Sequence, residues 1–103
     1  MTPRYKITFE FDAWRSVTGP ERHGVFGSVR VQGEDRLWFG WGIAVHSTED
    51  EWDYMEGCMW AFMRACASLD GEPLNAAFLA FDSLTKNELL TDGKVKRVVW
   101  MGR

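Results

Sequence analysis

Apolar and polar side chains alternate strictly over residues 4–12, which predicts a strand with one buried face and one solvated face. A loop follows over residues 13–23, where Gly19-Pro20 is a turn signal. The apolar face of this predicted strand consists of Tyr5, Ile7, Phe9 and Phe11.

Two further strands are predicted over residues 24–32 and 36–46, joined by the polar hairpin loop Gly33-Glu34-Asp35. The two faces of the third strand differ in size. One face is large and apolar, and the other combines Trp38 with small residues that leave room for another element to lie against the sheet. The large face consists of Leu37, Phe39, Trp41, Ile43 and Val45, and the small residues are Gly40, Gly42 and Ala44.

The spacing of apolar residues then becomes helical and predicts one helix over residues 48–69. Thr48 and Glu51 fit a capping box at its start, and Gly71 supplies a stop signal after its end. The apolar stripe of this helix, at spacings of three and four residues, consists of Trp52, Met55, Met59, Phe62, Cys66 and Leu69.

The C-terminal part is predicted as a strand, a short helix and a strand. Residues 76–81 are short and apolar and are interpreted as a buried strand, with a helix as the open alternative because Ala and Leu are ambiguous. A short helix over residues 84–91 and a last strand over residues 94–101 follow. The predicted fold class is α+β (mixed α/β), in a single domain over residues 1–103: a three-stranded antiparallel sheet, a long helix, a strand, a short helix and a strand.

Composition narrows the function classes. The chain has 15 acidic and 12 basic side chains and a net charge of −3, which argues mildly against a dedicated nucleic-acid binder. The only cysteines, Cys58 and Cys66, would lie about 12 Å apart along one helix, too far for a disulfide. Unpaired cysteines, and no apolar run long enough to span a bilayer, predict a cytoplasmic protein.

Several acids carry a resemblance to a known fold. Asp12 ends the first predicted strand, Glu56 lies in the first turns of the helix, and Asp82-Ser83 follows residues 76–81. With the predicted element order, these features resemble a shortened core of the ribonuclease H-like fold. The resemblance implies that Asp12, Glu56 and Asp82 hold two Mg²⁺ ions for phosphodiester hydrolysis. In the competing interpretation, Asp12 and Asp82 are strand-end turn residues and Glu56 is a solvated helix residue.

Two functional hypotheses follow. The first is a small, acidic, non-catalytic binding protein that acts by protein–protein interaction, as phage anti-defence inhibitors, immunity proteins and antitoxins do, and that needs no cofactor. The second is a minimal divalent-metal nuclease of ribonuclease H-like type that uses Asp12, Glu56 and Asp82. The negative charge and the missing terminal helix of the family favour the first hypothesis, because partial versions of the fold also occur in non-catalytic proteins.

The candidate partner-binding residues are acids near the start of the helix and tryptophans outside the main apolar faces. These acids suit a partner with a basic surface, and exposed tryptophan is enriched at binding hot spots. A second packed layer on the reverse face of the sheet is the alternative role for the tryptophans. The oligomeric state is open, because an edge strand could pair with a copy of itself. The candidates are Glu49, Asp50, Asp53, Glu56, Trp14, Trp38 and Trp60.

Overall fold

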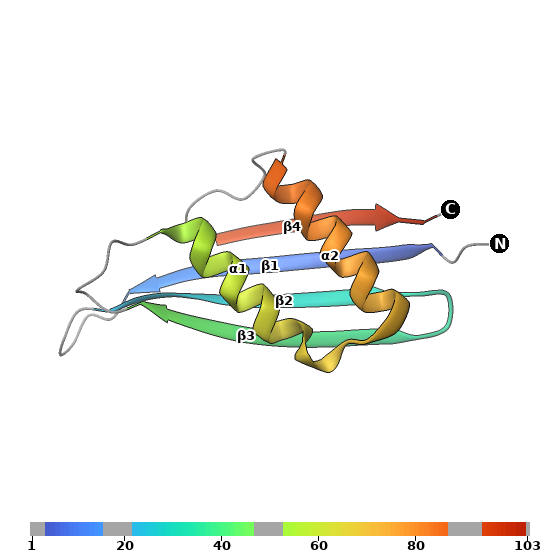
Figure 1. Cartoon of the computed structure of the whole chain (residues 1–103), viewed down its shortest axis with the longest axis horizontal. Helices are drawn as coiled ribbons and strands as arrows, with labels where there is room; N and C mark the ends of the chain where they lie inside the picture. The colour runs from blue at the N-terminus through green and yellow to red at the C-terminus, as the bar shows by residue number, and fades with distance from the viewer. Residues whose placement is uncertain (1–3, 16–21, 47–52, 87–93, 103) are drawn as a thin grey trace.

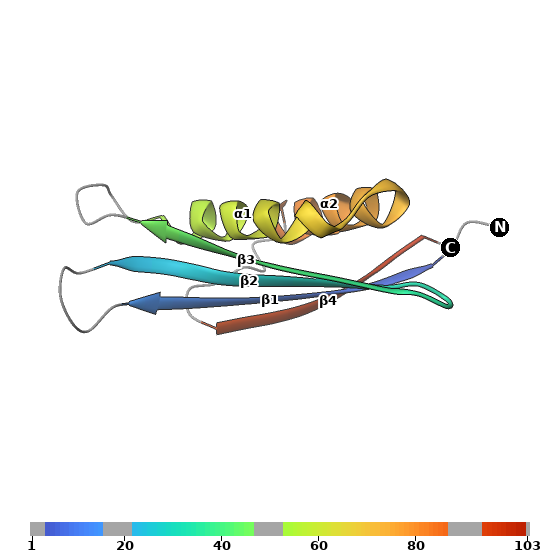
Figure 2. The same ribbon diagram turned by 90° about the horizontal axis from the view of Figure 1, so that it is seen from below.

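The computed structural model describes residues 4–15, 22–46, 53–86 and 94–102. Over these residues, four strands form one antiparallel sheet in the order β3-β2-β1-β4. Two α-helices cover one face of this sheet, and the other face carries no described helix (Figures 1 and 2). The elements are β1 (Tyr5–Arg15), β2 (His23–Gln32), β3 (Leu37–His46), α1 (Tyr54–Ala65), the 3₁₀ turn η1 (Cys66–Ser68), α2 (Gly71–Lys86) and β4 (Lys94–Met101).

The predicted fold class is correct as α+β but wrong in its main detail. The sheet has four strands over the described residues, not three, because β4 pairs antiparallel with β1 and places Arg97 opposite Phe9. The last strand was predicted at its observed position, residues 94–101, but alternation within a strand does not reveal its neighbour.

Residues 76–81 form part of α2, so their interpretation as a strand is wrong. Ala76, Ala77 and Ala80 are buried at helical spacing, and their small side chains let the helix lie close to the sheet. The short helix predicted over residues 84–91 begins inside α2, and residues 87–91 lie outside the described residues. The element order from which a shortened ribonuclease H-like core was predicted is therefore not the order of this chain.

The predicted long helix is divided. The helix α1 begins at Tyr54, where the carboxylate of Asp53 accepts hydrogen bonds from the backbone N–H groups of Met55 and Glu56, at 3.0 and 3.4 Å. The predicted capping box, Thr48 with Glu51, lies outside the described residues. Gly71, with a φ of 59°, stands at the start of α2, so the predicted stop signal separates two helices.

The core lies between the sheet and the two helices. The first strand contributes its predicted apolar face, and α1 and α2 contribute Cys58, Phe62 and Phe81. Both cysteines are buried and neither forms a disulfide, as the sequence predicted. The small residues of β3 receive α1, because a Cβ at Gly42 would meet the backbone of Ala61 at 2.5 Å. The prediction that another element lies against this face of β3 is confirmed.

Candidate binding surface

An open groove of about 620 Å³ lies between α1 and α2. We call it the interhelical groove. Its walls and floor are mostly apolar, and acidic side chains stand at one end. The helix α1 begins and α2 ends at this end of the helical layer (Figure 1). It is lined by Met55, Met59, Phe62, Met63, Phe78 and Phe81 and by Asp53, Glu56, Asp82 and Thr85.

Aromatic rings form the floor of the interhelical groove. Phe62 of α1 stacks on Phe81 of α2 with ring centroids 4.3 Å apart and planes 7° apart. Phe78 meets Phe62 edge-on at 5.4 Å. Because Phe62 and Phe81 are buried and packed against each other, the floor is a fixed surface.

The walls of the groove are exposed and adaptable. Met59 is 40% exposed, Met63 is 47% exposed and Phe78 is 43% exposed. Methionine side chains are unbranched and polarisable, and they are used at protein surfaces that fit apolar partners of varied shape. The walls therefore combine one ring with two side chains that can rearrange around an occupant.

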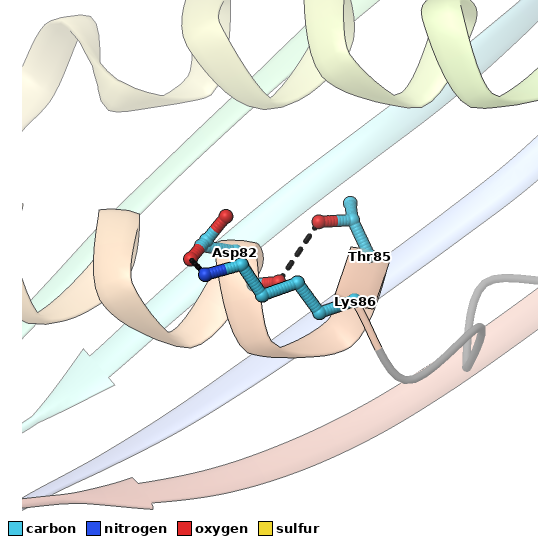
Figure 3. Close-up of polar contacts among 3 residues, drawn as sticks. All are labelled: Asp82, Thr85 and Lys86. Atoms are coloured by element: carbon cyan, nitrogen blue, oxygen red, sulfur yellow. Dashed lines mark hydrogen bonds and ion pairs between the residues drawn. The ribbon is translucent and has the colours of Figure 1, made fainter.

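The acidic end of the groove contains residues from both helices. Asp53 caps α1, and Glu56 is exposed one turn further along. In α2, the carboxylate of Asp82 lies 2.9 Å from the ammonium of Lys86, and the hydroxyl of Thr85 donates to the backbone carbonyl of Asp82 (Figure 3). Since both side chains of the Asp82–Lys86 pair are exposed, this pair adds little stability.

The three acids predicted as metal ligands do not converge. Asp12 is exposed on the helix-free face of the sheet, because its neighbours Phe11 and Ala13 point toward the core. Glu56 and Asp82 both border the interhelical groove on the other side of the sheet. Within the described parts of the chain, no three His, Cys, Asp or Glu side chains lie together in a way that could hold a metal ion.

The predicted partner-binding residues are distributed over different surfaces. Asp53 and Glu56 lie together at the groove, while Glu49 and Asp50 fall outside the described residues. Trp14 is half-buried, and its ring lies over Gly24, where a Cβ would come within 2.2 Å of it.

The other two predicted tryptophans lie on the helix side of the molecule. Trp38 is half-buried and meets Tyr5 edge-on, with ring centroids 6.2 Å apart. Trp60 is 45% exposed and lines a smaller cavity of about 200 Å³ beside the end of β3, together with Asp53 and Glu56. Of the three predicted tryptophans, Trp60 therefore shares a cavity with the predicted acids, whereas Trp14 and Trp38 lie elsewhere.

A second apolar surface covers the helix-free face of β3. We call it the β3 strip: its side chains alternate with the small residues that face α1, and each is at least 40% exposed. Phe26 of β2 lies beside it, with its ring stacked on Trp41 at 6.0 Å. The strip consists of Leu37, Phe39, Trp41, Ile43 and Val45.

Cys66 and Tyr5 have raised pKa values, and both lie outside the groove. Burial raises the pKa of the Cys66 thiol from 9.0 to about 11. Burial, together with the neighbouring Glu72 carboxylate, raises the pKa of Tyr5, whose hydroxyl donates to Glu72 at 3.0 Å. Neither group has the lowered pKa of an activated nucleophile.

Two features of these surfaces were missed by reasoning from sequence. Met59 and Phe62 were assigned to one apolar stripe, but Met59 is exposed and Phe62 is buried, because α2 covers only part of that stripe. Phe78 was assigned to a strand. The available signal was the row Met55, Met59 and Met63, which follows one side of the helix at intervals of four residues.

Comparisons with protein-family models, with curated proteins and with solved structures found no match to this chain. Among the described residues, neither helix has the length and apolar character required to cross a membrane.

Proposed function

We propose that this chain is a small, acidic, non-catalytic binding protein that acts by covering a partner protein, in the manner of anti-defence inhibitors, immunity proteins or antitoxins. The observation that carries the proposal is the interhelical groove, which combines an apolar floor and walls with an acidic end. A groove of this kind accepts the apolar face of an amphipathic helix.

The charge of the groove specifies the partner further. Asp53 and Glu56 stand at one end of the groove. Asp53 also caps the N-terminus of α1. A partner helix with apolar residues spaced to fit Met59, Met63 and Phe78, and with Lys or Arg at one end, would bury the exposed apolar surface and meet both carboxylates. Such charges mainly set the association rate and the choice of partner.

A site-specific crosslinking experiment tests this proposal. A photoreactive amino acid replaces Met63 in the groove, and in a second protein it replaces Lys96, which is exposed on the helix-free face of the sheet in β4. Both proteins are irradiated in the cells that make the chain. We expect a defined adduct from position 63 and not from position 96. The captured protein is then purified, and its binding to the wild-type chain is measured by calorimetry.

Matched charge variants make the calorimetry decisive. Glu56→Lys should weaken binding about tenfold or more, because a cation of the partner would then face a cation. Glu34→Lys makes the same change of charge in the hairpin between β2 and β3 and should leave affinity within about twofold. Equal affinity for the wild-type chain and Glu56→Lys, or an adduct formed only from position 96, would contradict the proposal.

A further inference from the structure

The β3 strip is as large as the largest apolar patch of an ordinary monomer. Its side chains are between 40 and 57% exposed, and Phe26 beside them is 39% exposed. Together these residues present roughly 600 Å² of surface, at the upper end of the roughly 300–600 Å² of the largest patch on a typical monomer. Contiguous apolar surface of this size marks an interaction site.

The edge of β3 is less available than its face. Within the described residues, β3 has a neighbouring strand on one side only. The guanidinium of Arg64 donates to the carbonyl of Ile43, and the hydroxyl of Ser68 donates to the carbonyl of Phe39 at 2.9 Å. A strand added at this edge would compete with both hydrogen bonds. An occupant lying on the helix-free face would disturb neither.

The absence of charge in β3 makes the strip suitable for contact with its own copy. A two-fold axis places the residues near it opposite their own copies, so a charge near the axis of such an interface faces a like charge. Residues 37–46 contain no Asp, Glu, Lys or Arg. The strand at the opposite edge, β4, contains Lys94, Lys96 and Arg97, and two copies meeting there would repel.

We propose that this chain forms a two-fold symmetric homodimer in which two β3 strips pack face to face around Trp41. The two sheets form a sandwich, with both helical layers on the outside. Burial of both strips removes roughly 1,200 Å² from water, at the lower end of the range of specific protein–protein interfaces. On β2 beside the strip, Ser28 is buried next to Trp41, and Arg30 is exposed next to Phe39. This proposal does not rest on the interhelical groove, which remains exposed in the dimer.

Sedimentation equilibrium of the wild-type chain and of two matched variants tests the dimer. Trp41 and Trp100 are 57 and 54% exposed on the same face, in strands at opposite edges of the sheet. We expect the wild-type chain to have twice the mass of the 11.9 kDa monomer. Trp41→Glu should raise the dimer dissociation constant about a hundredfold or more, because the change occurs twice per interface. Trp100→Glu, beside Arg4 and Lys6, should remain dimeric.

Crosslinking provides a second measurement, because a covalent link records contact between two chains even where the dimer is weakened. Facing sheets are about 10 Å apart, so a short bismaleimide should join two chains that carry Trp41→Cys. Position 100 lies in β4, three strands away from β3, so chains that carry Trp100→Cys should not be joined. The native Cys58 and Cys66 are buried, and the wild-type chain treated with the same reagent measures the crosslinking that they cause.

The result that would overturn the dimer is a wild-type chain that stays monomeric as its concentration is raised. A dimer that Trp41→Glu and Trp100→Glu weaken equally would also overturn it. A monomer whose tryptophan fluorescence is quenched by single-stranded oligonucleotides would assign the strip to nucleic acid instead. Circular dichroism of each variant shows that the fold is retained, so a loss of association can be attributed to the interface.

Discussion

Gly40 of β3 lies directly under the backbone carbonyl of Ala65 in α1, where a Cβ at position 40 would come within 1.9 Å of that oxygen. The same contact also brings Ser68 over the strand, where its hydroxyl reaches the carbonyl of Phe39. Because α1 requires the small side of β3, the larger side chains of the strand face the other way. The position of one glycine is therefore linked to the exposure of the β3 strip.

The first prediction concerns this close approach. Gly40→Ala should lower the free energy of unfolding by about 3 kcal/mol, because the methyl group would meet main-chain atoms and α1 would have to move away from the sheet. Urea denaturation followed by circular dichroism measures the change.

Gly33→Ala is the matched control for Gly40→Ala. A Cβ at Gly33 would meet Trp38 and Tyr5 at 3.4 Å, which is ordinary contact. This variant should change the free energy of unfolding by less than about 1 kcal/mol. If both variants lose the same stability, the approach of α1 to Gly40 is not as close as the structure indicates.

The strands were predictable because their signals are local. Alternation places Phe9 and Phe11 on one face whatever the neighbouring strand is, and the polar hairpin loop at Gly33 needs only a few residues. The pairing of β4 with β1 was not predictable, because it joins residues almost 90 positions apart, such as Phe9 and Arg97, and no local pattern encodes it.

The candidate site was only partly predictable, for the same reason. Glu56 was identified from its place in the first turns of the predicted helix, and it does border the groove. Phe78, across the groove from Glu56, could be placed only if the structure of residues 76–81 was known. The alanines of this segment fit a strand or a helix equally well by composition. Tertiary contact with the sheet decides between them, and with a strand in place of α2 there would be no groove.

The second prediction separates the two roles of Asp53. Asp53→Ala should lower the free energy of unfolding by about 1 kcal/mol, because the N–H groups of Met55 and Glu56 lose their acceptor. Asp53→Ser keeps an acceptor and should be close to wild type in stability while it removes the charge from the groove. Thermal denaturation of both variants checks this, and equal losses would show that the hydrogen bonds are not the source of the stability.

The third prediction follows from the pKa of Cys66. Burial raises this pKa from 9.0 to about 11, so the unfolded chain releases the proton at a lower pH than the folded chain does. The stability linked to this thiol should therefore be fully present below pH 9 and be lost as the pH rises toward 11. Urea denaturation across this range should show a smaller decrease for Cys66→Ala than for the wild-type chain. An identical pH dependence in the two proteins would exclude Cys66 as its source.

The last prediction concerns the contact between β1 and α2 made by Tyr5 and Glu72. Burial is the largest cause of the raised Tyr5 pKa, followed by the hydrogen bond to Glu72 and its negative charge. Glu72→Gln removes the charge, so the pKa of Tyr5 should fall but stay above 10.0 because the ring remains buried. Phenolate absorbance measures this pKa directly in a Tyr54→Phe background, since Tyr5 and Tyr54 are the only tyrosines in the chain.

Tyr5→Phe provides the matching measurement of stability. At neutral pH it should lower the free energy of unfolding by about 1 kcal/mol, because the hydrogen bond from the Tyr5 hydroxyl to Glu72 is lost while the exposed Glu72 carboxylate binds water instead. Above pH 10.0 the difference should shrink, because the wild-type chain loses stability as the unfolded chain ionises first, and the variant has no such group at this position. If instead the difference grows with pH, the folded state must favour the phenolate, and the placement of Tyr5 against Glu72 would be wrong.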